Sequence, residues 1–164
     1  MAHYVIVGGG RVGTRLACAL DAAGHSVALV DRDPRTVDGL VPGFSGELVA
    51  GVGFDRSALL AAGIDRAQGL AAVTADDNTN IIAARVARET FHVDHVVARI
   101  YDADRARLEA EHQEAAEHDR GGAGAGLVVR LDNFAVDDIA VGGGVGDLVL
   151  DTRHELLKAG TDLA

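Results

Sequence analysis

The feature that most constrains this chain is its glycine-rich start, VIVGGGRVG at residues 5–13. Gly8, Gly10 and Gly13 fit the pattern G-x-G-x-x-G, which follows a short apolar run and precedes residues with helical spacing. The first glycine permits a tight turn, the second lets a pyrophosphate approach the backbone, and the third lets the helix pack close to the strand. The pattern predicts a phosphate-binding turn, with a turn used only for packing as the alternative.

An acidic residue at the expected distance favours binding over packing. Asp31 ends the second apolar run and stands 18 residues after Gly13, near the spacing of about 20 residues in dinucleotide-binding sites. Its carboxylate is predicted to accept hydrogen bonds from the adenosine ribose hydroxyls and to repel the 2′-phosphate of NADP. Arg32 either offsets part of that repulsion or faces water.

Short apolar runs alternate with helical patterns along the first hundred residues. This order, with short links, predicts a parallel sheet with right-handed crossovers, and therefore an α/β fold. Asp55 is expected to cap a helix that Gly63 ends. Strands are expected at residues 4–7, 27–30, 46–52, 70–73 and 96–100, and helices at 11–23, 57–62, 77–90 and 103–118.

Composition argues against several classes of function. The 164 residues include 25 acidic and 15 basic ones, a net charge of −10, and no basic stretch suited to neutralising nucleic-acid or membrane phosphates. No apolar run approaches the ~18 residues that span a bilayer. The single cysteine permits no internal disulfide and supports no zinc site. We therefore expect a cytoplasmic protein without metal, nucleic-acid partner or membrane insertion, linked to any membrane through a protein partner.

Four segments in this order resemble a known family. They look like the TrkA-N domain, also called the RCK domain (regulator of potassium conductance), over about residues 3–103. The glycine turn occurs in many dinucleotide folds, whereas the later segments are far more particular. The four segments are VIVGGGRVG, AGHSVALVDRD, LLAAGIDRAQGLAAVTADDNTN and VDHVVARIYD.

The resemblance implies both a fold and a function. The fold is a Rossmann-like, doubly wound parallel sheet in three αβα layers that binds NAD(H) or ATP/ADP. In this family the domains form dimers, often within rings, beneath a membrane potassium transporter or channel. The nucleotide switches the assembly and is not consumed, so the resemblance implies a regulatory subunit at the inner face of the cell membrane, with no catalytic residues.

The resemblance also assigns roles to residues of the glycine turn. Gly8, Gly10 and Gly13 form the phosphate turn, and Arg11 and Val12 lie within it. Arg11 is expected to reach a nucleotide phosphate, sometimes that of the neighbouring subunit. The alternative is an exposed side chain at the start of a helix.

The adenosine region agrees with the family in part. Asp31 is the ribose acid, and Arg32 is expected to help hold the adenosine. After the third strand the family usually has Gly-Asp, but this chain has Gly51 and Val52, and Val52 cannot accept a hydrogen bond from the adenine amino group. Either Asp55 compensates, or backbone and apolar contacts alone hold the adenine.

Further candidate residues follow the fourth and fifth strands, because ligands of such sheets bind beyond the carboxyl ends of the strands. Thr74 and Ala75 are expected near the phosphates or the second half of a dinucleotide. Asp76 is a candidate contact, although helix capping is favoured for it. Arg99 lies in an apolar strand, where an unpaired guanidinium is costly, so it needs a carboxylate, a phosphate or a subunit interface. The resemblance favours the nucleotide and the dimer contact.

The end of the chain is different in character. Residues 1–120 are expected to form the nucleotide-binding domain, and residues 121–164 a divergent glycine-rich tail that either stays separate or adds a sixth strand and a last helix. No compact substrate region or acid–base pair is recognisable after residue 103. A fragment of an NAD-dependent dehydrogenase and a stand-alone dinucleotide sensor are therefore the alternatives to a regulatory subunit.

Overall fold

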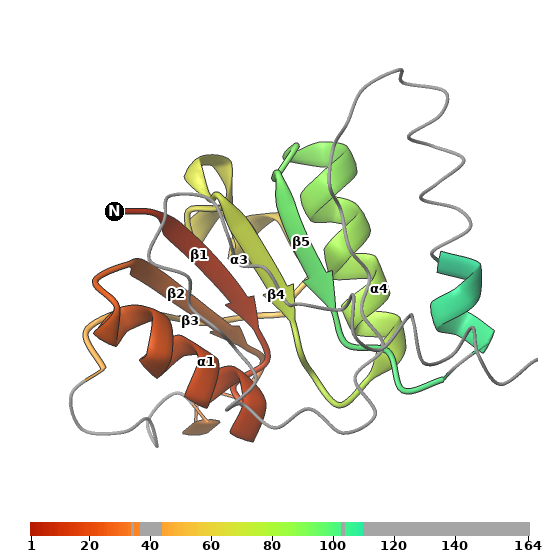
Figure 1. The fold of residues 1–164 in the computed structure, drawn as a ribbon, viewed down its shortest axis with the longest axis horizontal. Helices are drawn as coiled ribbons and strands as arrows, with labels where there is room; N and C mark the ends of the chain where they lie inside the picture. Colours follow the sequence, from red (N-terminus) through yellow and green to blue (C-terminus); the bar gives the residue numbers. More distant parts are fainter. Residues whose placement is uncertain (34, 37–43, 103, 110–164) are drawn as a thin grey trace, which may run out of the picture.

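A computed structural model of the chain describes residues 1–33, 35–36, 44–102 and 104–109. Within them, five parallel strands form one sheet in the order β3-β2-β1-β4-β5 (Figure 1). The strands are β1 (His3–Val7), β2 (Ser26–Asp31), β3 (Glu47–Ala50), β4 (Gly69–Ala72) and β5 (His95–Ala98). The helices are α1 (Arg11–Ala22), α3 (Arg56–Ala61) and α4 (Asp77–Arg85), with a 3₁₀ turn η1 (Ile64–Arg66) and a π-helical turn η2 (Val86–Thr90).

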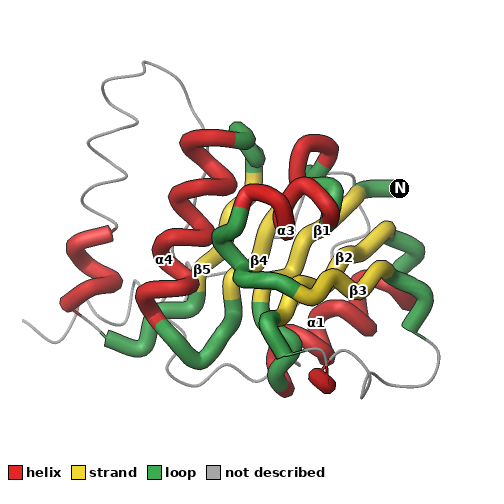
Figure 2. Tube along the Cα trace, turned by 180° about the vertical axis from the view of Figure 1, so that it is seen from behind, coloured by secondary structure: helices red, strands yellow, loops and turns green. Residues whose placement is uncertain are grey.

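Helices cover both faces of this sheet. Helix α1 lies on one face, whereas α3 and α4 lie on the other, as the two opposite views show (Figures 1 and 2). In β1, Tyr4 and Ile6 join the apolar cluster around α1, and Val5 and Val7 join the cluster around α3 and α4. Burial on both faces explains why β1, β2 and β4 are largely apolar runs, whereas the edge strand β3 is mostly exposed. The three-layer α/β fold is confirmed.

The strand order reverses between β1 and β4. Strand β1 pairs with β2 on one side and with β4 on the other, in both cases parallel. The glycine turn leaves β1 toward α1, whereas residues 74–76 leave β4 toward α4 on the opposite face. Ligands of doubly wound sheets bind at such a point, beyond the carboxyl ends of the strands.

The expected elements have the observed order, with one difference in kind. The helix expected over residues 77–90 is α-helical to Arg85 and then widens into η2, where the Phe91 N–H donates to the Val86 carbonyl at 3.3 Å. His92, with a φ of +54°, follows this wide turn. No helix of the described residues is long and apolar enough to cross a membrane.

Two sequence expectations are only partly covered by the structure. Residues 104–109 are helical, in agreement with the helix expected over 103–118. The rest of that helix lies outside the described residues, as do the tail at 121–164 and its expected strand and helix.

Candidate functional site

The turn after β1 depends on two glycines for its shape. Gly8 has a φ of +109°, and a Cβ on it would lie 2.8 Å from the Thr74 backbone nitrogen. A Cβ on Gly13 would collide with the Gly8 carbonyl oxygen, so helix α1 can approach the strand only with glycine there. Gly10 is different, because a Cβ there would meet no other described atom within 4 Å. The backbone of the second motif glycine is thus open to an incoming group.

The start of α1 presents backbone donors beside this open position. Gly10 is the N-cap residue, and no side chain caps the helix. The first helical bond runs from the Thr14 N–H to the Gly10 carbonyl at 2.9 Å, so the N–H groups of residues 11–13 precede the ladder. Those donors and the helix dipole suit a phosphate. Val12 adds only its backbone, since its side chain packs against the core near α1.

Asp31, at the end of β2, holds the glycine turn in place. Its Oδ2 accepts from the Gly9 N–H at 2.6 Å, and its Oδ1 accepts from the Asp33 N–H at 2.8 Å. The side chain is half-buried, and each carboxylate oxygen keeps a second lone-pair direction for another donor. Asp31 can therefore orient the turn and accept from a ligand hydroxyl at the same time.

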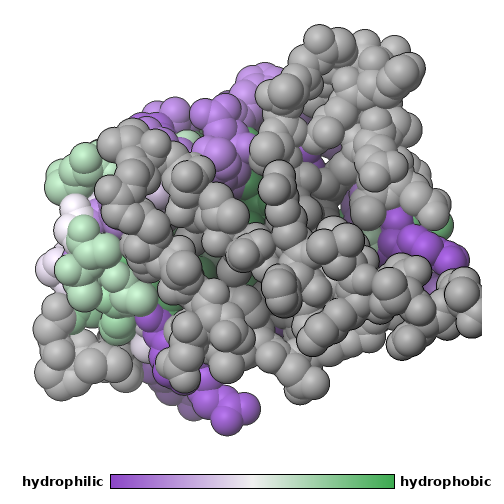
Figure 3. All heavy atoms as spheres, in the orientation of Figure 1, coloured by the Kyte–Doolittle hydropathy of each residue, from purple (hydrophilic) through white to green (hydrophobic). Residues whose placement is uncertain are grey.

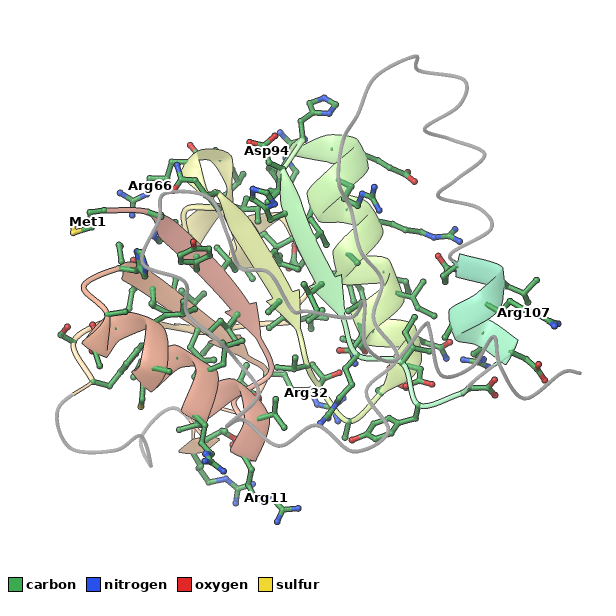
Figure 4. All side chains as sticks on the ribbon, in the orientation of Figure 1. Met1, Arg11, Arg32, Arg66, Asp94 and Arg107 are labelled. Atoms are coloured by element: carbon green, nitrogen blue, oxygen red, sulfur yellow. The ribbon has the colours of Figure 1, made fainter. Side chains whose placement is uncertain are left out.

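Two exposed arginines flank this part of the molecule. Arg11 and Arg32 lie at the end toward which the strand arrows point, whereas Arg66 and Asp94 lie at the opposite end (Figure 4). Hydrophilic side chains gather on the same edge, where α1 begins (Figure 3). Both side chains are exposed. Both arginines are available to an anion.

The loop after β4 is ordered by its own polar groups. Asp76 is the N-cap residue of α4, where its Oδ2 accepts from the Thr79 N–H at 2.8 Å and from the Thr79 hydroxyl at 2.6 Å. The Thr79 hydroxyl, followed by the Thr79 N–H, lowers the pKa of the Asp76 carboxyl. The stabilisation by this cap is therefore complete above the unfolded-state pKa and is lost as the pH falls through the lowered value. Ala75 is exposed beside it.

Asn80 is a structural residue of this site to which the sequence assigned no role. Its side chain is 0% exposed. Its Oδ1 accepts from the Thr74 N–H at 2.9 Å and from the Thr74 hydroxyl at 2.7 Å, and its Nδ2 donates to the carbonyls of Thr74 and Arg99 at 3.0 and 2.8 Å. One amide thus joins α4 to the ends of β4 and β5. In the sequence, the only indication of this role is that a polar residue occupies the buried side of a predicted helix.

Replacing Asn80 with alanine is expected to destabilise the protein by about 2 kcal/mol, because partly buried backbone groups of Thr74 and Arg99 lose their partner. Chemical denaturation measures this change. Asn78→Ala on the same helix is the control, because Asn78 is exposed and bonds only to Arg105 among the contacts described. Its expected cost is below about 1 kcal/mol. Equal losses for the two variants would contradict this role of Asn80.

Arg99 contacts a carbonyl and an aromatic ring rather than a carboxylate. Its Nη2 donates to the Thr74 carbonyl at 2.7 Å, and its guanidinium lies 4.7 Å from the centre of the Tyr101 ring. The buried Nε has no hydrogen-bond partner among the residues that the structure describes. The half-buried guanidinium is therefore only partly satisfied, next to the loop that follows β4.

Asp55, which follows β3, directs its carboxylate to the start of helix α3. Its Oδ1 accepts from the Ser57 N–H at 3.0 Å and caps α3, as expected. The Gly51 N–H donates to the Asp31 carbonyl at 2.9 Å, which ties this segment to the end of β2. Val52 is 42% exposed. The Asp55 carboxylate thus serves the helix, and the side chain beside Gly51 is apolar.

Taken together, the described residues place an uncapped helix start with open backbone donors, the Asp31 carboxylate and two exposed arginines at one end of the sheet. No group of three or more His, Cys, Asp or Glu side chains in the described part of the chain is arranged to hold a metal ion. Backbone donors at a helix start suit a phosphate, and a carboxylate suits sugar hydroxyls.

Comparison with known proteins places the chain among similar sequences. A family model described as the TrkA-N domain matches residues 4–116. The Trk system potassium uptake protein TrkA of Streptomyces coelicolor is 55% identical over 106 residues, which are 65% of this chain and 48% of that protein. The chain spans about half the length of that protein and of two further curated relatives that it matches.

Solved structures share the fold. The TrkA-N domain of the inner membrane protein ybaL from Escherichia coli superposes with a TM-score of 0.60 at 20% identity, over 74% of this chain and 96% of that one. The structure of GsuK bound to ADP gives a TM-score of 0.55 at 27% identity, over 77% of this chain and 30% of that one.

Proposed function

Because this chain belongs to the TrkA-N domain family, we propose that it is a cytoplasmic regulatory component of a potassium transport system and that it works by binding an adenine nucleotide. The observation that carries the proposal is the open backbone at Gly10, beside the uncapped start of α1 and the turn-bound carboxylate of Asp31. The 55% identical relative is a potassium uptake protein, and a 27% identical structure has ADP bound. The ligand is NAD(H) or ATP/ADP.

The proposed binding mode follows the order of the loops along the sheet. The phosphates would lie against the N–H groups at the start of α1, with Arg11 adding a charge-assisted contact. The ribose hydroxyls would donate to Asp31, and the base would extend over Gly51 and Val52, with Arg32 beside the adenosine. In a dinucleotide, the second half would reach Thr74, Ala75 and Arg99, whose unpartnered Nε suits an oxygen acceptor.

Regulation would arise from differential binding. Two nucleotides share the adenosine contacts but differ at the phosphate or nicotinamide end, where the loops of β1 and β4 face each other. A ligand shifts the equilibrium between two domain arrangements only by its difference in affinity for them. These domains would form a homodimer or a larger ring, and a membrane potassium transporter or channel would respond to the arrangement of the domains within it.

Binding of NAD, NADH, ADP, ATP and NADP, followed by calorimetry, tests the ligand. We expect at least one adenine nucleotide to bind, NADP to bind more weakly than NAD, and Arg11→Ala to weaken binding about tenfold, because one charge-assisted contact is lost. Arg66→Ala is the control, since Arg66 is also exposed but lies at the opposite end of the molecule (Figure 4). Its binding should equal that of the wild type.

Two results would count against the proposal. If no nucleotide binds, the proposed class of ligand is wrong. Specific NADH turnover with a small carbonyl substrate would instead favour a dehydrogenase. Small-angle scattering of the full chain tests regulation separately. Identical profiles with all bound nucleotides would speak against a nucleotide-dependent change of arrangement.

A further inference from the structure

One carbonyl after β4 accepts from two side chains that come from different parts of the chain. The Thr74 carbonyl accepts from Arg99 Nη2 at 2.7 Å and from Asn80 Nδ2 at 3.0 Å. Thr74 also lies against the glycine turn, since a Cβ on Gly8 would be 2.8 Å from its backbone nitrogen and 3.0 Å from its Cα. Thr74 therefore links the glycine turn to the guanidinium of Arg99.

The Asn80 amide fixes the main chain on both sides of this contact. Its Nδ2 donates to the carbonyls of Thr74 and Arg99, and its Oδ1 accepts from the N–H and the hydroxyl of Thr74. Both amide hydrogens and both lone-pair directions of the oxygen are thus used. A flipped amide would put its oxygen against two carbonyls, so the side chain has a single favourable orientation.

Helix capping does not account for the position of Asn80. Asp76 is the N-cap residue of α4, and the Asn80 N–H donates to the Asp76 carbonyl at 3.1 Å. The Asn80 side chain is 0% exposed, so a ligand does not reach it. Any effect of Asn80 on a ligand therefore passes through Thr74 or Arg99, the residues that it holds.

Arg99 has the properties of the group that passes this effect on. Its half-buried guanidinium is held by the Thr74 carbonyl and lies 4.7 Å from the centre of the Tyr101 ring. Its Nε has no partner among the described residues. A guanidinium that is already held in place loses less freedom when it binds an oxygen acceptor. Without Asn80, the Thr74 carbonyl and the Arg99 main chain lose the contacts that provide this preorganisation.

We infer that Asn80 is a positioning residue for the second half of a dinucleotide, and that it acts through Thr74 and Arg99. This inference rests on the proposed function, of which it takes the dinucleotide case. In that binding mode the adenosine 5′-phosphate lies at Asp31 and the glycine turn, whereas the second half reaches Arg99. Loss of the Asn80 amide therefore weakens a dinucleotide more than AMP, which has no second half.

Calorimetric titration of the full chain with AMP and with NAD, or NADH if it binds more tightly, tests the inference. For Asn80→Ala we expect the Kd of the dinucleotide to rise about tenfold or more, and that of AMP to change less than about threefold. A merely structural role would weaken both ligands alike. Asn78→Ala is the matched control, because Asn78 is an exposed residue of the same helix, and it should keep the wild-type Kd for both ligands.

A double-mutant cycle shows whether Asn80 acts through Arg99. Arg99→Ala alone should weaken the dinucleotide about tenfold. Adding Asn80→Ala should then change its Kd by less than about threefold, because the contact that Asn80 positions is already absent. An equal effect of Asn80→Ala with and without Arg99 would overturn the inference.

Asn80→Asp serves as a second variant of nearly the same shape if Asn80→Ala does not fold. It keeps the oxygen that accepts from the Thr74 N–H and replaces the amide nitrogen that donates to the carbonyls of Thr74 and Arg99. We expect the same selective loss of dinucleotide affinity, and equal losses for AMP would contradict the inference.

The remaining outcomes separate this inference from the function on which it rests. Failure of AMP, the dinucleotides, ADP and ATP to bind the wild type would reject the proposed function itself. Binding of ADP or ATP without NAD or NADH would leave that function standing and overturn the inference. A selective loss of dinucleotide affinity in Asn80→Ala that disappears in the Arg99→Ala background would support it.

Discussion

Replacing Asp31 with alanine is expected to weaken nucleotide binding at least about one-hundredfold. The variant loses the carboxylate that would accept from two ribose hydroxyls, and each hydrogen bond to a charged group contributes about 1.5–3 kcal/mol. It also releases the Gly9 and Asp33 N–H groups, which Asp31 binds at 2.6 and 2.8 Å, so the glycine turn loses a constraint. Calorimetric titration with ADP and NADH measures the loss.

Two companion variants show whether the ribose contact is responsible. Asp33→Ala removes a neighbouring carboxylate that pairs with Arg35, and its affinity should stay within about twofold of the wild type, since surface ion pairs contribute little. Asp31→Asn keeps one acceptor oxygen and should bind with intermediate affinity. Wild-type affinity in Asp31→Ala would remove this residue from the site.

Two glycine-to-alanine changes are expected to have opposite effects on folding and binding. In Gly13→Ala the new methyl group would collide with the Gly8 carbonyl. We expect a loss of about 3 kcal/mol or more in the free energy of unfolding, at the upper end of overpacking costs, because a backbone oxygen cannot move away cheaply. Thermal denaturation should show a melting temperature lower by roughly 6–12 °C.

Gly10→Ala should leave the fold intact and reduce binding. Its backbone, at φ −69° and ψ −173°, suits alanine, and a Cβ there would meet no described atom within 4 Å. The same methyl group would occupy the space through which a pyrophosphate reaches the turn, so we expect a wild-type melting temperature with at least tenfold weaker ADP binding. Unchanged affinity in a folded Gly10→Ala protein would mean that the turn serves packing alone.

Several parts of the fold could be predicted from residues close together in the chain. The glycine spacing predicts a strand–turn–helix unit, because Gly8 and Gly13 pack against each other within one turn. The cap by Asp55 was predictable for the same reason, since the carboxylate binds an N–H two residues later. The π-helical end of the helix after β4 was not, because both helical forms satisfy the same apolar pattern.

The candidate site depends more on contacts across the sheet. Asp31 was predicted as a ligand acceptor from its spacing, but its hold on Gly9 needs the pairing of β1 and β2. The partners of Arg99 also come from another strand end, since the Thr74 carbonyl is 25 residues away. Spacing along the chain carries no information about such partners, because a side chain bonds to whatever the folded sheet brings near it.

What the sequence by itself determined is the parallel α/β architecture and the glycine turn between β1 and α1, since both arise from local periodicity and from the steric freedom of glycine. The tertiary structure alone decided that Asn80 joins two strand ends, and that Val52 and Phe54 stay exposed beside the end of β1. The physical reason is burial. Whether a polar group is free for a ligand or an apolar group is open to one depends on neighbours that only the folded sheet supplies.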